Sequence, residues 1–145
     1  LNMGNSHDII SSIVSILHDG PYEMPRQSIA RVFYRICEAE GIGAASARYR
    51  DLKTNHAGAY RFDESELNRL GYSYLRDGKI DKAIAVFKLN VESFPGSANV
   101  YDSIGEAYMR GGNRSLAIEN YRRSLDLNPE NANAKRMLEQ LEKDG

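Results

Sequence analysis

The sequence predicts an all-α fold in which antiparallel helical hairpins stack into a solenoid, closed by a C-terminal capping helix. Two observations predict it: apolar residues recur at helical spacing along most of the chain, and the second half repeats with a period of 34 residues. A repeat of this length is one helical hairpin, which cannot bury its apolar face alone and therefore stacks on its neighbours. Seven residues recur unchanged at that spacing: Gly71 with Gly105, Tyr74 with Tyr108, Arg76 with Arg110, Gly78 with Gly112, Ala83 with Ala117, Ile84 with Ile118 and Pro95 with Pro129.

The composition argues against several classes of protein. Its 145 residues suit one domain, with or without an appendage. The 19 Lys and Arg residues nearly balance the 20 Asp and Glu residues, so the formal net charge of −1 provides no broad surface for nucleic acid or anionic lipid. Cys37 is the single cysteine, which rules out an intramolecular disulfide. The longest apolar stretch, 9–17, is too short to span a bilayer, and we expect no membrane insertion.

Residues 1–25 are predicted to form one helix and a connector. Ser6 can cap a helix that runs to about Asp19, where a Gly-Pro pair ends it. The connector at 22–25 is expected to be extended, because residues before proline avoid the helical region. The chain begins at Leu1 without an initiator methionine, so we expect a fragment or an excised domain.

Helical hairpins are predicted for the rest of the chain. Apolar spacing indicates helices at 26–40 and, more weakly, 44–54. Asp63 and Glu66 have the spacing of a capping box at the start of the periodic region. No strand is expected beyond the first few residues. The periodic region should contain helices at roughly 64–76, 80–93, 98–110, 114–127 and 132–142.

Gly71 and Gly105 are expected to lie inside helices, where glycine costs about 1 kcal/mol relative to alanine. Glycine at the same phase of both repeats therefore needs a packing reason. We expect close approach of the second helix of each hairpin, with Ala83 and Ala117 as its small side chains.

The pattern resembles the tetratricopeptide repeat, whose 34-residue unit has large, Leu, Gly, Tyr, Ala, aromatic and Pro residues at fixed places. The resemblance implies a right-handed solenoid, with repeats at 64–97 and 98–131 and a capping helix at 132–145. Residues 26–59 fit the same frame as a degenerate repeat before a linker at 60–63, and the alternative is an unrelated helical hairpin. Asn90 and Ser124 depart from the small apolar residue usual at their place. The matching residues are Leu67, Leu70, Gly71, Tyr74, Ala83, Phe87 and Pro95, then Tyr101, Ile104, Gly105, Tyr108, Ala117, Tyr121 and Pro129.

Residues 1–25 resemble the end of a serine beta-lactamase-related (penicillin-binding-protein-like) domain, through an Asn-x-Gly-Asn turn, a last helix and a Gly-Pro-Tyr-x-x-Pro exit. The resemblance implies that 1–25 is the remnant of an upstream hydrolase domain of the same polypeptide, and that the protein is then periplasmic or secreted. The Ser-x-x-Lys and Tyr-x-Asn motifs of that family are absent from this chain, so no catalytic role carries over. The compartment is otherwise not determined.

No catalytic, cofactor or metal site is predicted, and the chain is not expected to be an enzyme. His7, His18 and His56 are scattered and lack metal-ligand spacing. Cys37 lies on an apolar helical stripe and is expected to pack in the core. The carboxylates are spread over solvated faces with no pair suited to acid–base work.

By resemblance, the first helix of each hairpin lines a concave face. Arg76 and Arg110 could hold a carboxylate of a partner, or each could satisfy carbonyls at its own helix end. The Lys and Asn set with which some family members clamp a peptide C-terminus is missing, since Asn68 and Tyr72 stand at two of those places, and capture of chaperone tails is not expected. The candidate partner-binding residues are Asn68, Tyr72, Arg76, Asn99, Asp102, Glu106, Arg110, Arg136 and Gln140.

The leading hypothesis for function is a protein-protein interaction module that binds a peptide or partner surface on this concave face. The alternative is a structural or assembly appendage of a beta-lactamase-like serine hydrolase whose catalytic domain lies outside the chain.

Overall fold

The computed structural model describes residues 10, 13, 17 and 25–143. The predicted helix from Ser6 to Asp19 lies mostly outside them; Ile10, Ile13 and Leu17 are helical and exposed. The elements in chain order are β1 (Gln27–Ser28), α2 (Ile29–Glu40), α3 (Ile42–Asn55), η1 (Ala57–Ala59), β2 (Tyr60–Arg61), α4 (Glu64–Arg76), α5 (Ile80–Ser93), α6 (Ala98–Arg110), α7 (Arg114–Leu127) and α8 (Ala132–Lys143).

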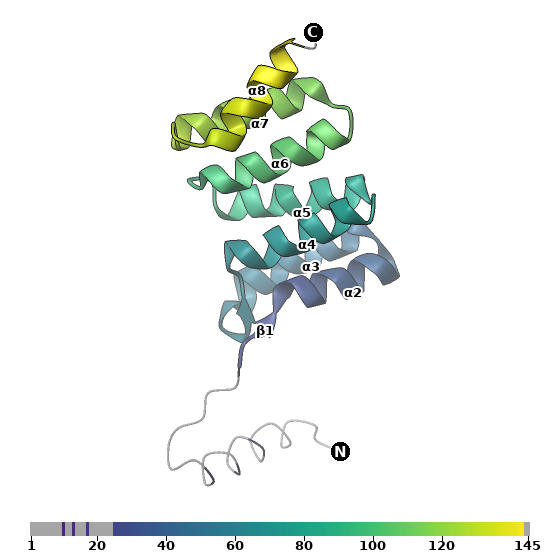
Figure 1. The fold of residues 1–145 in the computed structure, drawn as a ribbon. Coiled ribbons are helices and arrows are strands. Elements are labelled where there is room, and N and C mark those ends of the chain that lie inside the picture. The colour runs from purple at the N-terminus through teal and green to yellow at the C-terminus, as the bar shows by residue number, and fades with distance from the viewer. Residues whose placement is uncertain (1–9, 11–12, 14–16, 18–24, 144–145) are drawn as a thin grey trace.

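The helices form a stack of antiparallel hairpins that runs from α2, beside β1, to α8 (Figure 1). Helices α2 and α3, α4 and α5, and α6 and α7 pair as hairpins, and α8 packs on α7. Across the hairpins, α4 contacts both α2 and α6, and α3 contacts α5. The predicted all-α solenoid is therefore confirmed.

The helix boundaries agree with the sequence prediction in the periodic region and differ before it. Helix α2 begins at Ile29 rather than residue 26, because Gln27 and Ser28 are extended and Ser28 caps the helix through a bond from Arg31 N–H at 3.4 Å. The expectation of no strand in this region is wrong: β1 and β2 pair in parallel, with Gln27 opposite Tyr60. Helix α3 is also longer than the predicted 44–54.

The turns inside the two periodic hairpins are built alike. Gly78 and Gly112 have φ of 70° and 75°, the left-handed region that suits glycine after a helix end. The N–H groups of Lys79 and Asn113 donate to Tyr74 and Tyr108 carbonyls at 2.9 Å in both cases. This recurrence explains why the glycines repeat at a spacing of 34 residues.

The in-helix glycines make room for an aromatic ring of the second helix. A Cβ built on Gly71 would lie 2.4 Å from a ring carbon of Phe87, and one on Gly105 would lie 3.1 Å from Tyr121. Both rings are fully buried. The predicted close approach of the partner helix is therefore an aromatic ring lying against the backbone of the first helix.

Asn90 and Ser124, the two departures from the family pattern, perform the same task. Asn90 Nδ2 donates to the Glu64 carbonyl at 3.0 Å, and Ser124 Oγ donates to the Ala98 carbonyl at 2.8 Å. Both donors are fully buried. Each bond joins the second helix of a hairpin to the first residue of its first helix, which explains why a polar side chain is tolerated in the core.

The predicted capping box at Asp63 is wrong, because Glu66 is engaged elsewhere. Its side chain is only 3% exposed and accepts from Arg61 at 3.2 Å and Arg69 at 3.0 Å, while Ser28 Oγ donates to its second oxygen. Asp63 makes no side-chain cap bond. A buried carboxylate needs such partners, and this one ties α4 to the β1–β2 pair.

Replacement of the in-helix glycines by alanine should affect stability differently in the two hairpins. Gly71→Ala gains about 1 kcal/mol of helix propensity but should lose about 2–3 kcal/mol to the clash with the immobile Phe87 ring. Gly105→Ala should remain within about 0.5 kcal/mol of the wild type, because Tyr121 needs to move only a few tenths of an ångström. Urea unfolding of both variants checks this, and equal losses would contradict it.

Candidate functional site

The candidate site is the surface formed by the first helices α4 and α6 together with α8, named here the first-helix face. It bears all nine predicted partner-binding residues. The structure gathers several of them into two hydrogen-bonded groups and leaves others exposed.

The first group joins α4 to α6 through Ser103, a residue that the sequence did not indicate. Ser103 Oγ donates to Asn68 Oδ1 at 2.8 Å, and Tyr72 OH donates to Ser103 Oγ at 3.4 Å. Burial raises the pKa of Tyr72, so its hydroxyl stays a neutral donor. Tyr72 also packs edge-on against Phe87, with ring centroids 5.3 Å apart. Asn68 and Tyr72 are therefore positioned by packing as well as by polar contacts.

The second group joins α6 to α8 around Asp102. Its two oxygens accept from Asn131 Nδ2 at 3.1 Å and Asn133 Nδ2 at 2.9 Å. Arg136 donates to Asn133 Oδ1 at 2.8 Å. Burial raises the pKa of Asp102, because neutral amides compensate only partly for lost hydration. The carboxylate has no ion pair with any residue of 25–143 and keeps lone pairs for a donor.

The remaining predicted residues belong to neither of these two groups. Glu106 pairs with Arg110 at 2.7 Å within α6. Arg110 is therefore occupied inside its own helix, whereas Arg76 is exposed and makes no ion pair among the described residues. Asn99 Nδ2 donates to Glu64 Oε1 at 2.7 Å. Gln140 is exposed on α8.

Tyr121 places a phenol beneath this surface without a partner. Its ring is fully buried against Gly105, and its hydroxyl makes no hydrogen bond to any of the residues that the structure describes. Burial raises the pKa of Tyr121, and the charges of Asp102 and Glu106 raise it further. Phe87 occupies the same place in the preceding hairpin, so the hydroxyl is not required by the fold.

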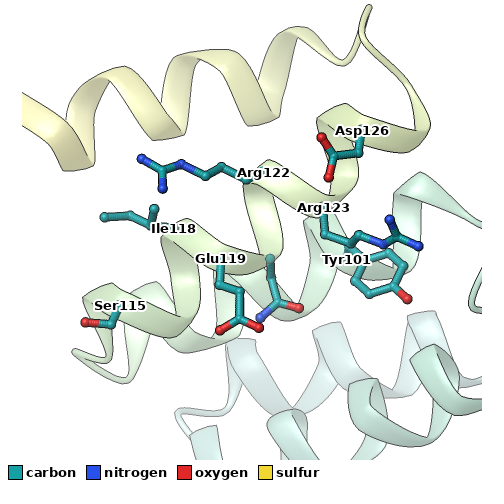
Figure 2. Close-up of a pocket in the computed structure, with 8 residues that line it drawn as sticks. Tyr101, Ser115, Ile118, Glu119, Arg122, Arg123 and Asp126 are labelled. Atoms are coloured by element: carbon teal, nitrogen blue, oxygen red, sulfur yellow. The ribbon is translucent and has the colours of Figure 1, made fainter.

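A separate hollow of about 500 Å³ lies on α7, on the face opposite its buried residues (Figure 2). Two arginines and two carboxylates line it, and Arg123 lies over the Tyr101 ring at 5.7 Å from the centroid. Arg122 pairs with Glu142 of α8 at 2.8 Å. The charges in this hollow balance and bring no catalytic pair together. Its lining is Tyr101, Ser115, Ile118, Glu119, Asn120, Arg122, Arg123 and Asp126.

Neither a cluster of metal ligands nor a membrane-spanning helix is found in the described part of the chain. Across 25–143 and the three described N-terminal positions, no three His, Cys, Asp or Glu side chains gather as metal ligands would. None of the helices described in this range has the length and apolar character needed to cross a membrane. Cys37 is buried, as its apolar stripe indicated.

The helices that form this surface match a known repeat family. The tetratricopeptide repeat models match residues 69–97, on α4 and α5, and residues 98–131, on α6 and α7. Residues 69–131 are tetratricopeptide repeats. The matched segments carry both aromatic–glycine contacts and the buried bond from Ser124 to Ala98, together with Asn90, whose acceptor Glu64 lies just before them. The expected repeat at 26–59 stays a prediction, as does the resemblance of 1–25 to a beta-lactamase-related domain.

Curated relatives share these repeats over a limited length. The chain is 36% identical over 64 residues to the tetratricopeptide repeat domain-containing protein PYG7, chloroplastic, of Arabidopsis thaliana, and the match covers 44% of this chain and 21% of that protein. It is 32% identical over 62 residues to Superkiller complex protein 3 of Homo sapiens, covering 43% of this chain and 4% of that protein. The chain thus spans about a fifth of the first relative and 4% of the second.

A solved structure shares the fold over most of the chain. It is the first TPR of Spaghetti (RPAP3) bound to the HSP90 peptide SRMEEVD, with a TM-score of 0.57 and 18% identity. The match covers 84% of this chain and 98% of that one. It supports the helical stack, including part of the chain before the matched repeats.

Two Tyr→Phe variants should test the roles of a buried tyrosine hydroxyl without a partner, on α7, and of one with a partner, on α3. Tyr121→Phe should leave the free energy of unfolding unchanged or raise it by up to about 1 kcal/mol, because it removes a buried hydroxyl without a partner. Tyr49→Phe should cost about 1 kcal/mol, because Tyr49 OH bonds Ser93 Oγ at 2.9 Å. Thermal and urea unfolding measure both, and a larger loss for Tyr121→Phe would contradict the assignment.

Proposed function

We propose that this chain is a protein-protein interaction module that binds an extended peptide segment of a partner on the first-helix face. The observation that supports the proposal is the pair of tetratricopeptide repeats whose first helices present fixed polar side chains. Stacked helical repeats commonly use such extended surfaces for partners.

The polar groups on this surface can recognise a peptide backbone and its side chains. Asp102 offers acceptor oxygens for a peptide N–H or a cationic side chain. The exposed guanidinium groups of Arg76 and Arg136 offer donors for carbonyl or carboxylate groups. Asn68 and Tyr72 are already held by Ser103. A partner would therefore meet side chains whose conformational entropy is partly lost before binding.

The similarity to a peptide-bound structure supports this class of partner but not its identity. SRMEEVD is bound by the Spaghetti (RPAP3) domain, which is only 18% identical to this chain. Asn68 and Tyr72 stand where a Lys and Asn set would be needed for a carboxylate clamp. We therefore propose a peptide other than a chaperone tail as the partner.

The structural-appendage alternative has no specific observation in its favour. The segment that resembles the end of a hydrolase domain, 1–25, lies mostly outside the described residues. No enzymatic activity is proposed for the chain.

Selection of displayed random peptides on the full 145-residue chain would test the proposal, followed by titration of the recovered peptides. The double variant Arg76→Ala/Arg136→Ala should bind at least about tenfold more weakly, since both arginines are exposed on the first-helix face. The matched control Arg122→Ala/Arg123→Ala removes the same charge from α7 and should bind normally.

Equal weakening of peptide binding in both double variants would indicate nonspecific electrostatic attraction and contradict the proposed surface. Failure to recover any peptide with saturable binding would contradict the proposed function itself.

The peptide SRMEEVD provides a second, independent prediction. Titrated into this chain, it should show no saturable binding at concentrations up to about 1 mM, a free energy weaker than about −4 kcal/mol. The physical reason is the missing clamp at Asn68 and Tyr72. Isothermal titration calorimetry measures this, and binding that Tyr72→Ala abolishes would overturn the prediction.

A further inference from the structure

We propose that the chain has a second binding site, a pocket of arginines at the N-terminal end of the stack that takes the phosphate group of a phosphorylated ligand. The pocket is about 520 Å³ and is lined by residues of β1, β2 and α2, with Arg26 just before β1. Figure 1 shows β1 leading into α2 at the N-terminal end of the stack. Its lining shares no residue with the nine predicted partner-binding residues of the first-helix face, so the ligand of the pocket is a different one from the peptide proposed above. Its lining is Arg26, Gln27, Ser28, Arg31, Val32, Arg35 and Arg61.

The pocket concentrates positive charge that the rest of the fold does not neutralise. Four arginines line it, and no carboxylate does among the described residues. Arg61 pairs with the buried Glu66, which also pairs with Arg69. Arg26, Arg31 and Arg35 form no ion pair with any residue of 25–143. In a chain whose net charge is −1, three guanidinium groups are thus left facing one hollow.

The backbone fixes this cluster from two distant segments. Arg31 and Arg35 are one helical turn apart on the polar side of α2, whose buried residues are Ile29, Phe33 and Cys37. The parallel pairing of Ser28 with Arg61 brings the fourth arginine to the start of the same helix. The positive end of the α2 dipole adds to the potential there.

A phosphate monoester fits this donor set better than a single carboxylate. One carboxylate has two oxygens and one charge, which a single bidentate arginine can satisfy. A phosphate monoester carries about −1.5 to −2 charges at neutral pH and three acceptor oxygens. The volume also exceeds what a bare phosphate ion needs, so the ligand should extend beyond its phosphate group.

Titration of inorganic phosphate into the full chain, at constant ionic strength, would test the site. The arginine Nε–H signals of Arg31 and Arg35 should shift saturably in NMR spectra. Arg31→Gln/Arg35→Gln should weaken binding by about tenfold or more, whereas Arg122→Gln/Arg123→Gln on α7 should not. Arg61 is left in place because it holds Glu66.

The pH dependence identifies the anion. Inorganic phosphate should bind more weakly at pH 5, where it is a monoanion, than at pH 7.5, where it is largely a dianion, while sulfate binding should change little. Absence of a saturable shift, or equal weakening in both double variants, would overturn the site. So would a tenfold gain in affinity on Glu23→Gln, since a carboxylate of the chain would then fill the pocket.

The source of the phosphate is distinguished by two further probes. A phosphoserine-containing heptapeptide that binds at least about tenfold more tightly than free phosphoserine would indicate a phosphorylated protein segment. Equal affinities would indicate a small phosphorylated molecule. An unphosphorylated heptapeptide with Glu at the same place that binds equally well would overturn the preference for phosphate.

Discussion

The stack depends on one contact, an aromatic ring of the second helix lying on a glycine of the first. Phe87 on Gly71 and Tyr121 on Gly105 set how closely the helices of each hairpin approach. Side chains three or four residues away then reach their partners at fixed distances, including the buried bonds from Asn90 and Ser124. The polar groups of the first-helix face follow from the same spacing, because α4, α6 and α8 take their places from the hairpins behind them.

The sequence predicted much of this fold because the residues that create the period are the packing residues. The ends of α4 to α7 could be placed from Gly78, Gly112, Pro95 and Pro129, each of which acts locally. Glu66 could not be assigned in the same way. Its spacing from Asp63 indicated a local cap, but its partners include Ser28, which is 38 residues away and is brought close only by the tertiary pairing of two short strands.

The candidate surfaces were predicted less completely, because many of their contacts join residues that are far apart in the sequence. Asp102 and Arg136 were identified from their place in the repeat, whereas the linking Asn133 was missed although it lies 34 residues after Asn99. Ser103 was missed because a small buried serine leaves no signal in a helix. The arginine pocket was also missed: Arg31 and Arg35 are visible as neighbours on one helix, but Arg61 joins them through β1–β2 pairing that two-residue strands do not reveal.

The bonds from Asn90 and Ser124 have a consequence for how the chain can change in length. Both close within a single hairpin, from its second helix back to the first residue of its first, rather than reaching the neighbouring hairpin. These two bonds are thus complete within each 34-residue unit, whereas the bonds of Ser103 to Asn68 and Tyr72 cross to the preceding unit. Insertion or removal of a whole unit breaks neither of the bonds from Asn90 and Ser124, whereas a cut between residues 64 and 90, or between 98 and 124, separates a donor from its carbonyl. The architecture is therefore suited to growth by duplication in whole units.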